Sequence, residues 1–250
     1  CKKTVSAFML GKSALDVALN EDLVKIIEKY MGSPCTLAEA NAIEDKSTSY
    51  QYFGLHSDFY NGWKKNKKME KTIRDSDLKH PIGVGVIYYL HKTESGAFKY
   101  SIRSHKIQAK YGLKIEMYPE KVKEKILNNV NICIGNAGDL IIFDDRGFHG
   151  PDQPSNNERR VLNFDYYRDK TFGSVIVEPH KVKVNDLGTL SRKQQKVLGF
   201  HAKNLVEPEE YVYSRFKKNK LFGTLSWIVK HAYFFAHIKN LLKSKLGYNK

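Results

Sequence analysis

Three residues, far apart in the sequence, have the types and spacing of a metal-binding site. His56 and Asp58 form the single His-x-Asp of the chain, and residues two apart on a strand point to the same side. His149, which follows an apolar run, is the natural third ligand. Two histidines and one carboxylate leave three metal positions open for a co-substrate and O2, which suits non-haem Fe(II). A structural zinc ion would need a fourth protein ligand, usually with thiolates.

The motif alone is weak, because the chain has nine histidines and a lone histidine is more often packed or at the surface. Arg160, eleven residues after His149, strengthens it. Alternate residues from Arg160 to Tyr166 share one apolar face, which predicts a guanidinium deep in a barrel. A buried arginine needs an anion, either a dicarboxylate co-substrate held by the iron or a core carboxylate. Arg159 is expected at the surface, and a slip of one residue in register would exchange the two roles.

Short β-rich segments separated by Gly, Asn and Asp turns must position these residues. They favour an antiparallel sandwich or barrel, mainly β with flanking helices. The segments 83–90 and 97–103 are expected to form a hairpin, and 140–143 and 161–167 an antiparallel pair. The remaining strands are expected at 35–43, 49–58, 131–134 and 175–177, and helices at 20–30, capped by Asn20, at 119–128 and within 187–198.

Charge and cysteine content limit the function classes. The net charge of +15 favours an anionic partner, unless lysine serves solubility alone. Three unpaired cysteines predict no disulfide framework and a reducing compartment, so a cytoplasmic location is expected. No stretch approaches the roughly 20 apolar residues of a membrane span. A cluster just after the His-x-Asp is either a solvated loop or the binding site of an anionic substrate; it comprises Lys64, Lys65, Lys67, Lys68 and Lys71.

The last fifty residues differ in character from the rest. We expect a β-domain over 1–200 and a basic helical tail over 201–250, with a long helix at 221–246. Large apolar side chains with interspersed lysines suit the interface of an anionic membrane, which would place the protein peripherally on a membrane's inner face. Packing on the β-domain or on a second subunit is equally compatible. Nucleic-acid binding is not expected, because no recognised module is present.

The motifs, taken in order, resemble those of phytanoyl-CoA dioxygenase-type Fe(II)/2-oxoglutarate oxygenases over 23–167. The resemblance implies a double-stranded β-helix (a cupin-like jelly roll) with His56, Asp58 and His149 as iron ligands. It also implies 2-oxoglutarate and O2 as co-substrates, with Arg160 on the distal carboxylate of 2-oxoglutarate. Arg103 and Pro151 depart from the pattern, standing where a glycine and a small hydroxyl residue are usual. The matching segments are His56-Ser-Asp58, Gly96-Ala-Phe, Ser104-His-Lys106, Gly138-Asp-Leu-Ile-Ile-Phe, His149-Gly150 and Arg160.

Together, the resemblance and the charge pattern lead to a substrate hypothesis. The chain is similar to bacterial dioxygenases that hydroxylate the acidic octulosonic sugar of lipopolysaccharide, so a membrane glycolipid is one expected substrate. Hydroxylation of another small molecule or of an acyl-CoA is the broader alternative. A third possibility is a metal-free binding protein on a membrane surface that keeps the fold without the chemistry. The sequence leaves the oligomeric state open.

Overall fold

The computed structural model describes residues 2–5, 7–45, 54–58, 81–107, 110–152, 159–168, 180–199 and 211–213. The chain divides into two compact units, Cys1–Ser214 and Arg215–Lys250, and all the described residues lie in the first. The lysine cluster at 64–71, the short strand expected at 175–177 and the helix expected at 221–246 lie outside the described residues. The domain boundary expected at residue 200 stays a prediction.

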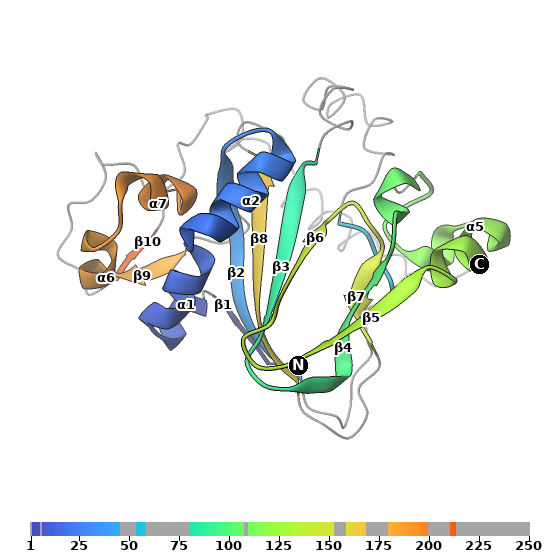
Figure 1. The fold of residues 1–250 in the computed structure, drawn as a ribbon, viewed down its shortest axis with the longest axis horizontal. Helices are drawn as coiled ribbons and strands as arrows, with labels where there is room; N and C mark the ends of the chain where they lie inside the picture. The colour runs from blue at the N-terminus through green and yellow to red at the C-terminus, as the bar shows by residue number, and fades with distance from the viewer. Residues whose placement is uncertain are drawn as a thin grey trace, which may run out of the picture. The chain divides into compact units, whose positions relative to one another are not determined.

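Two antiparallel sheets form the centre of the first unit (Figure 1). The main sheet has the order β1-β2-β8-β3-β6, and the second sheet has the order β5-β4-β7. Strands were correctly predicted from sequence for β2, β3, β4, β5, β6 and β8. Their bounds are β1 Lys2–Val5, β2 Cys35–Asp45, β3 Gly83–Tyr89, β4 Thr93–Ser101, β5 Val130–Gly135, β6 Leu140–Asp144, β7 His149–Pro151 and β8 Arg159–Arg168.

Two of the strand pairings expected from sequence are wrong. β3 and β4 do not form a hairpin, because β3 pairs with β6 and β8 in the main sheet while β4 pairs with β5 and β7 in the second. β6 and β8 are not antiparallel neighbours, because β3 lies between them and runs antiparallel to both. An apolar pattern identifies a strand but does not determine its partner. Of the strand expected at 49–58, only 54–58 is described, and there His56 forms an isolated bridge to His149.

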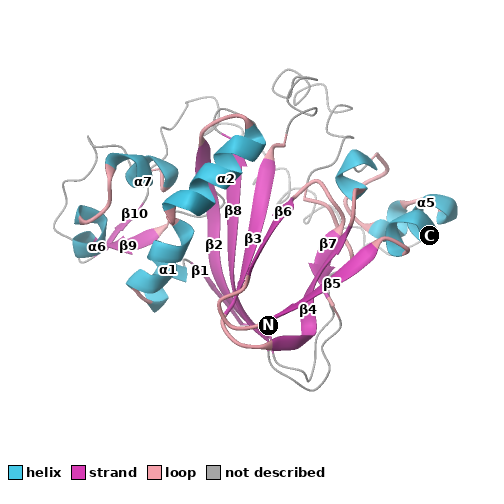
Figure 2. Ribbon diagram, viewed as in Figure 1, coloured by secondary structure: helices cyan, strands magenta, loops and turns pink. Residues whose placement is uncertain are grey.

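Helices cover the outer face of the main sheet (Figure 2). α1 (Lys12–Ala18) and α2 (Glu21–Met31) pack against β2, β3 and β8 in the largest apolar core. Asn20 caps α2 by accepting hydrogen bonds from the N–H groups of Asp22 and Leu23, as the sequence predicted. Gly32 ends α2 with a φ of 65°, a left-handed conformation that glycine adopts without strain.

The remaining helices and strands are short. α5 (Glu120–Leu127) confirms the helix expected at 119–128. The helix expected within 187–198 is present as two short helices, α6 and α7, and the small sheet β9-β10 lies next to them in the sequence. None of the helices in the described part of the chain is long and apolar enough to cross a membrane. Their bounds are η1 Ala7–Leu10, η3 Ser104–Ile107, η4 Ile115–Met117, α6 Val184–Gly188, α7 Arg192–Val197, β9 Lys181–Lys183 and β10 Tyr211–Tyr213.

Candidate metal centre

The structure brings His56, Asp58 and His149 together at one end of the second sheet. Their candidate ligand atoms all lie within 4.8 Å of one another. Oδ1 of Asp58 lies 3.7 Å from Nε2 of His56, and Oδ2 lies 3.4 Å from Nε2 of His149. The two imidazole centroids are 4.7 Å apart. The three side chains therefore converge on one point, which fits a single divalent ion.

Backbone hydrogen bonds hold the segment 54–58 against β7. The N–H of His56 donates to the carbonyl of His149 at 2.9 Å, and the N–H of His149 donates to the carbonyl of His56 at 2.8 Å. Two residues on, the N–H of Asp58 donates to the carbonyl of Asp145 at 3.1 Å. The hydroxyl of Ser57 donates to the carbonyl of Arg146 at 3.0 Å. The ligands thus depend on main-chain pairing that does not require a metal.

Both imidazoles are oriented by a backbone carbonyl. Nδ1 of His56 lies 3.0 Å from the carbonyl oxygen of Gly54, and Nδ1 of His149 lies 2.9 Å from that of Gly147. A carbonyl oxygen only accepts hydrogen bonds, so Nδ1 carries the proton in each ring. Nε2 of each neutral ring then keeps its lone pair toward Asp58. Such an outer hydrogen bond fixes the tautomer that a metal-binding histidine needs.

The electrostatics of the triad favour a cation. Burial disfavours a charged His149, but the adjacent carboxylate of Asp58 outweighs burial and raises the pKa of His149. Burial and the neighbouring His149 together lower the pKa of His56, despite the opposing effect of Asp58. Partial burial opposes ionisation of Asp58, yet the two histidines hold its pKa below the ordinary value. A metal ion takes the place of the proton on His149, so metal affinity falls as the pH is lowered.

The two arginines that open β8 exchange the places expected from sequence. Arg159 is buried, with 6% of its surface exposed, whereas the side chain of Arg160 is 54% exposed. Nε of Arg160 donates to Oε1 of Glu44 at 3.0 Å. The placement of Arg160 in the interior was therefore wrong: the face that it shares with Leu162, Phe164 and Tyr166 looks toward the helices and not toward the second sheet.

The physical reason is that helices, and not the second sheet, cover the apolar face of β8. Leu162, Phe164 and Tyr166 face the helices, and the hydroxyl of Tyr166 donates to the carbonyl of Ala18. The face that carries Arg159 also carries Val161, which packs against residues of the second sheet. An apolar face therefore does not by itself identify the space between the sheets.

Two carboxylates near the triad, the buried Asp145 and the half-buried Asp165, were not predicted from sequence. Burial, followed by the charges of Asp58 and Glu39, raises the pKa of Asp165 to about 8. Burial, followed by the charges of Asp165 and Asp58, raises the pKa of Asp145 well above its ordinary value. In the described structure neither carboxylate oxygen of Asp145 has a hydrogen-bond partner. The alternation of β8 places Asp165 opposite the apolar face and is a usable signal; Asp145 gives no such signal.

An aromatic wall backs His149. The ring centroid of Phe143 lies 4.7 Å from that of His149, and the centroid of Phe98 lies 4.5 Å from that of Phe143. Gly85, which is paired with Phe143 across the strands, leaves the space that this ring fills, because a Cβ there would collide with it. These rings limit the access of water to one side of the triad. The four candidate substrate residues, Lys64, Lys65, Lys67 and Lys68, lie outside the described residues.

Comparison with known proteins gives similarity at the level of fold. No family model matches the chain, and no curated protein matches it in sequence. The iron-bound structure of EctD from S. alaskensis is 15% identical and covers 67% of this chain and 57% of its own, with a TM-score of 0.51. Its apo form gives a TM-score of 0.52. HygX from Streptomyces hygroscopicus, solved with nickel and 2-oxoglutarate bound, is 17% identical over 67% of this chain and 72% of its own, with a TM-score of 0.48. The likeness to EctD shows a shared fold.

Proposed function

We propose that this chain is an Fe(II)- and 2-oxoglutarate-dependent oxygenase that hydroxylates a C–H bond. The convergence of His56, Asp58 and His149, with both imidazoles oriented through Nδ1, carries the proposal. The bound metal would supply activation of O2 and of the 2-oxoglutarate keto acid. The iron bound in the EctD structure supports the choice of metal.

The strand order supports a double-stranded β-helix as the fold of this enzyme. β2, β3, β6 and β8 lie in the main sheet, and β4, β5 and β7 lie in the second. The segment 54–58 adds to the second sheet through its bridge to β7. The chain therefore passes repeatedly from one sheet to the other, which is the path of a jelly roll.

Within this proposal each residue of the site has a role. His56, Asp58 and His149 would hold the iron and leave three of its positions for small molecules. Arg159, in place of Arg160, would bind the distal carboxylate of 2-oxoglutarate, because it is the arginine on the inner face of β8. Phe98 and Phe143 would exclude water from the side of His149.

Metal and turnover measurements on the same sample test the proposal. The full chain, purified without oxygen and supplied with Fe(II), is expected to bind about one iron ion and to convert 2-oxoglutarate slowly to succinate. Asp58→Ala is expected to abolish both, whereas Asp16→Ala, an exposed control on α1, is expected to change neither. A folded wild-type chain that binds neither iron nor 2-oxoglutarate would overturn the assignment. It would support instead a binding protein of the same fold.

For the substrate we propose an anionic molecule, such as a lipopolysaccharide sugar at a membrane surface. The net charge of +15 supports an anion. An acyl-CoA or another small molecule is the alternative. Succinate formation that is stimulated by the lipopolysaccharide sugar and not by an acyl-CoA would separate the two.

A further inference from the structure

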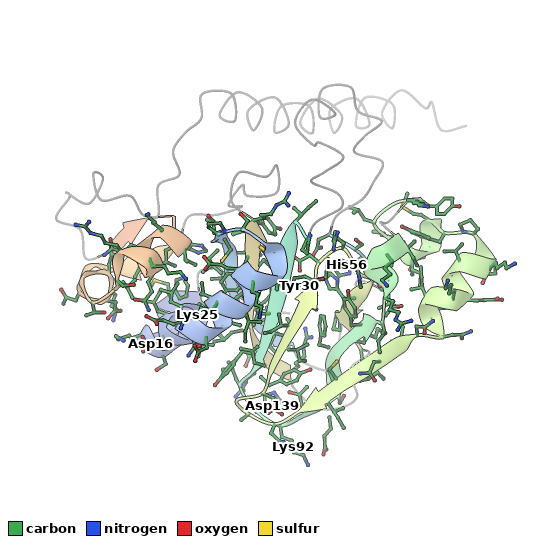
Figure 3. All side chains as sticks on the ribbon, turned by 45° about the horizontal axis from the view of Figure 1, so that its top comes forward. Asp16, Lys25, Tyr30, His56, Lys92 and Asp139 are labelled. Carbon is green, nitrogen blue, oxygen red and sulfur yellow. The ribbon has the colours of Figure 1, made fainter. Side chains whose placement is uncertain are left out.

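A cavity lies beside β6, and none of the three residues of the metal triad lines it. It has a volume of about 480 Å³, within the range of pockets that hold small molecules. One wall comes from α2 and β6, and the other comes from β4, β5 and the turn that follows β4. Phe143 lines the cavity, and its ring also contacts His149, so this cavity ends one side chain away from the triad. Figure 3 shows Tyr30, at the end of α2, and His56 near the same end of β6.

The walls of this cavity are apolar and exposed. Ile26 of α2, Ile102 after β4 and Ile142 of β6 line it and are 55%, 55% and 39% exposed. Isoleucines facing a shared cavity from three elements form a continuous apolar surface, which gains free energy when an apolar body covers it. An added strand fits this cavity less well than a small molecule, because the carbonyl of Asp144 at the end of β6 already accepts a hydrogen bond from the hydroxyl of Tyr100.

One end of the cavity is polar and carries a net positive charge. The carboxylate of Asp144 is neutralised by Arg146, at 2.5 Å, and accepts a hydrogen bond from Tyr30 at 2.8 Å. Arg103 and His105 also line the cavity, and His105 is close enough to Asp144 and Arg146 for their charges to act on its pKa. Among the described residues Arg103 is exposed and has no carboxylate partner. Its positive charge is therefore left for a ligand.

The backbone of Arg103 gives a second reason to single it out. Its φ is 65°, and it is the one non-glycine residue with a positive φ in the described part of the chain. Glycine takes this conformation without strain, whereas arginine does not. Strained residues that persist are concentrated at ligand-binding positions. The unfavourable backbone conformation therefore indicates that the guanidinium of Arg103 binds a ligand.

We propose that this cavity binds a free carboxylate with an apolar chain, such as a medium-chain fatty acid. The apolar chain lies between α2, β6 and the turn after β4, and the carboxylate pairs with Arg103. A guanidinium matches a carboxylate in shape as well as charge. The site is distinct from the proposed oxygenase site and does not depend on it.

Calorimetric titration of the full, metal-free chain with dodecanoate, below its critical micelle concentration, tests the proposal. Binding at one site is expected, with dodecan-1-ol and dodecyltrimethylammonium bound about tenfold more weakly or less. Arg103→Gly is expected to weaken dodecanoate binding about tenfold and to leave the melting temperature unchanged or higher, because glycine fits the backbone. Arg103→Lys, which keeps the charge, should retain most of the affinity.

Two further variants separate the cavity from general surface charge. Ile26→Trp fills the cavity from an exposed position and should block binding, whereas Arg192→Ala, on the exposed side of α7, should not. Equal binding of dodecanoate and dodecan-1-ol, or full affinity in Arg103→Gly, would overturn the proposal. So would absence of binding to the full chain, including the case in which another part of the chain fills the cavity. Arg103-dependent sedimentation with phosphatidylglycerol vesicles, without binding of free dodecanoate, would indicate a membrane surface instead and would also overturn it.

Discussion

Two adjacent arginines at the start of β8 face opposite sides of the main sheet, and this difference leads to a prediction for the co-substrate. If Arg159 binds the distal carboxylate of 2-oxoglutarate, Arg159→Ala should weaken 2-oxoglutarate binding by about 3 kcal/mol, or roughly 100-fold. Arg160→Ala should change the affinity by less than about twofold, because Arg160 is exposed and pairs with Glu44. Calorimetric titration of the Zn(II)-loaded chain with 2-oxoglutarate measures both. Loss of binding in Arg160→Ala alone would restore the sequence-based assignment.

His180 gives a prediction for acid stability. It is 1% exposed, and Nε2 lies 2.8 Å from the carbonyl oxygen of Leu37, so the neutral ring donates this hydrogen bond. Burial, only partly opposed by this bond, lowers its pKa from 6.5 to about 4. The unfolded chain binds a proton more readily between these values, so the stability from a neutral His180 is lost as the pH falls from about 6.5 to about 4.

The size of this loss is about 3 kcal/mol, and urea unfolding at pH 7 and pH 4.5 measures most of it. His180→Gln keeps a donor for the carbonyl of Leu37 but does not titrate over this range. The free energy of unfolding of the variant should therefore fall less between the two pH values than that of the wild type. Equal decreases would show that other groups govern acid stability.

At the residue scale, the triad was predictable and the arginine was not. His56, Asp58 and His149 have ligand types in a recognisable order, and the structure brings them together. The choice between Arg159 and Arg160 depends on which face of β8 looks toward the second sheet. The apolar face is covered by helices and the other face by the second sheet, and the pattern of a single strand does not show which layer covers which face.

At the level of elements, the contact between β3 and β6 supports the metal site. Gly85 lies opposite Phe143, and a Cβ at Gly85 would collide with three atoms of the phenyl ring. Gly85→Ala should therefore displace Phe143, which contacts His149, and destabilise the protein by about 1–3 kcal/mol. We expect metal affinity to fall about tenfold, as when an outer-layer residue of a metal site is lost.

A second substitution tests whether the collision is the cause. Phe143→Leu in the Gly85→Ala background removes the ring and should recover part of the stability and metal affinity, a coupling that a double-mutant cycle quantifies. Urea unfolding and Ni(II) titration provide the two measurements. Normal metal affinity in Gly85→Ala would show that Phe143 does not position His149.

The sequence identified the elements better than their arrangement. Short apolar runs predicted β3 at 83–90 and β6 at 140–143, and Asn20 predicted the start of α2. The pairing of β3 with β6 and β8, in place of β4, is a long-range property of the two sheets. It depends on which faces bury one another, and the local pattern is the same for either pairing.

At the scale of the whole molecule, the net charge does not describe the surroundings of the metal triad. The net charge of +15 led to the expectation of an anionic partner, yet two acids with a raised pKa, Asp145 and Asp165, lie near the metal triad. A net charge is dominated by solvated side chains and says little about a cavity a few residues wide. A metal ion at the triad would change the protonation of these two acids.

This protonation predicts that the stability of the protein depends on pH and that a bound metal reduces this dependence. The pKa of Asp165 rises from 3.8 to about 8 on folding, chiefly through burial and then through the charge of Asp58. The folded metal-free chain thus holds a proton that the unfolded chain releases, so the stability from a neutral Asp165 is present below about pH 4 and is lost as the pH rises toward 8. A divalent cation at His56, Asp58 and His149 favours the ionised carboxylate, lowers the pKa of Asp165 and reduces the loss.

Urea unfolding between pH 6.5 and 8 measures the effect, and the comparison with Asp165→Asn isolates it, because His149, whose pKa is raised, titrates in both proteins. Without metal the wild type should lose stability across the window, and Asp165→Asn, which keeps the shape and removes the charge, should lose less. Saturating Ni(II) should reduce the loss in the wild type and change the slope of Asp165→Asn less. If both proteins respond to pH and to Ni(II) in the same way, Asp165 does not sense the metal.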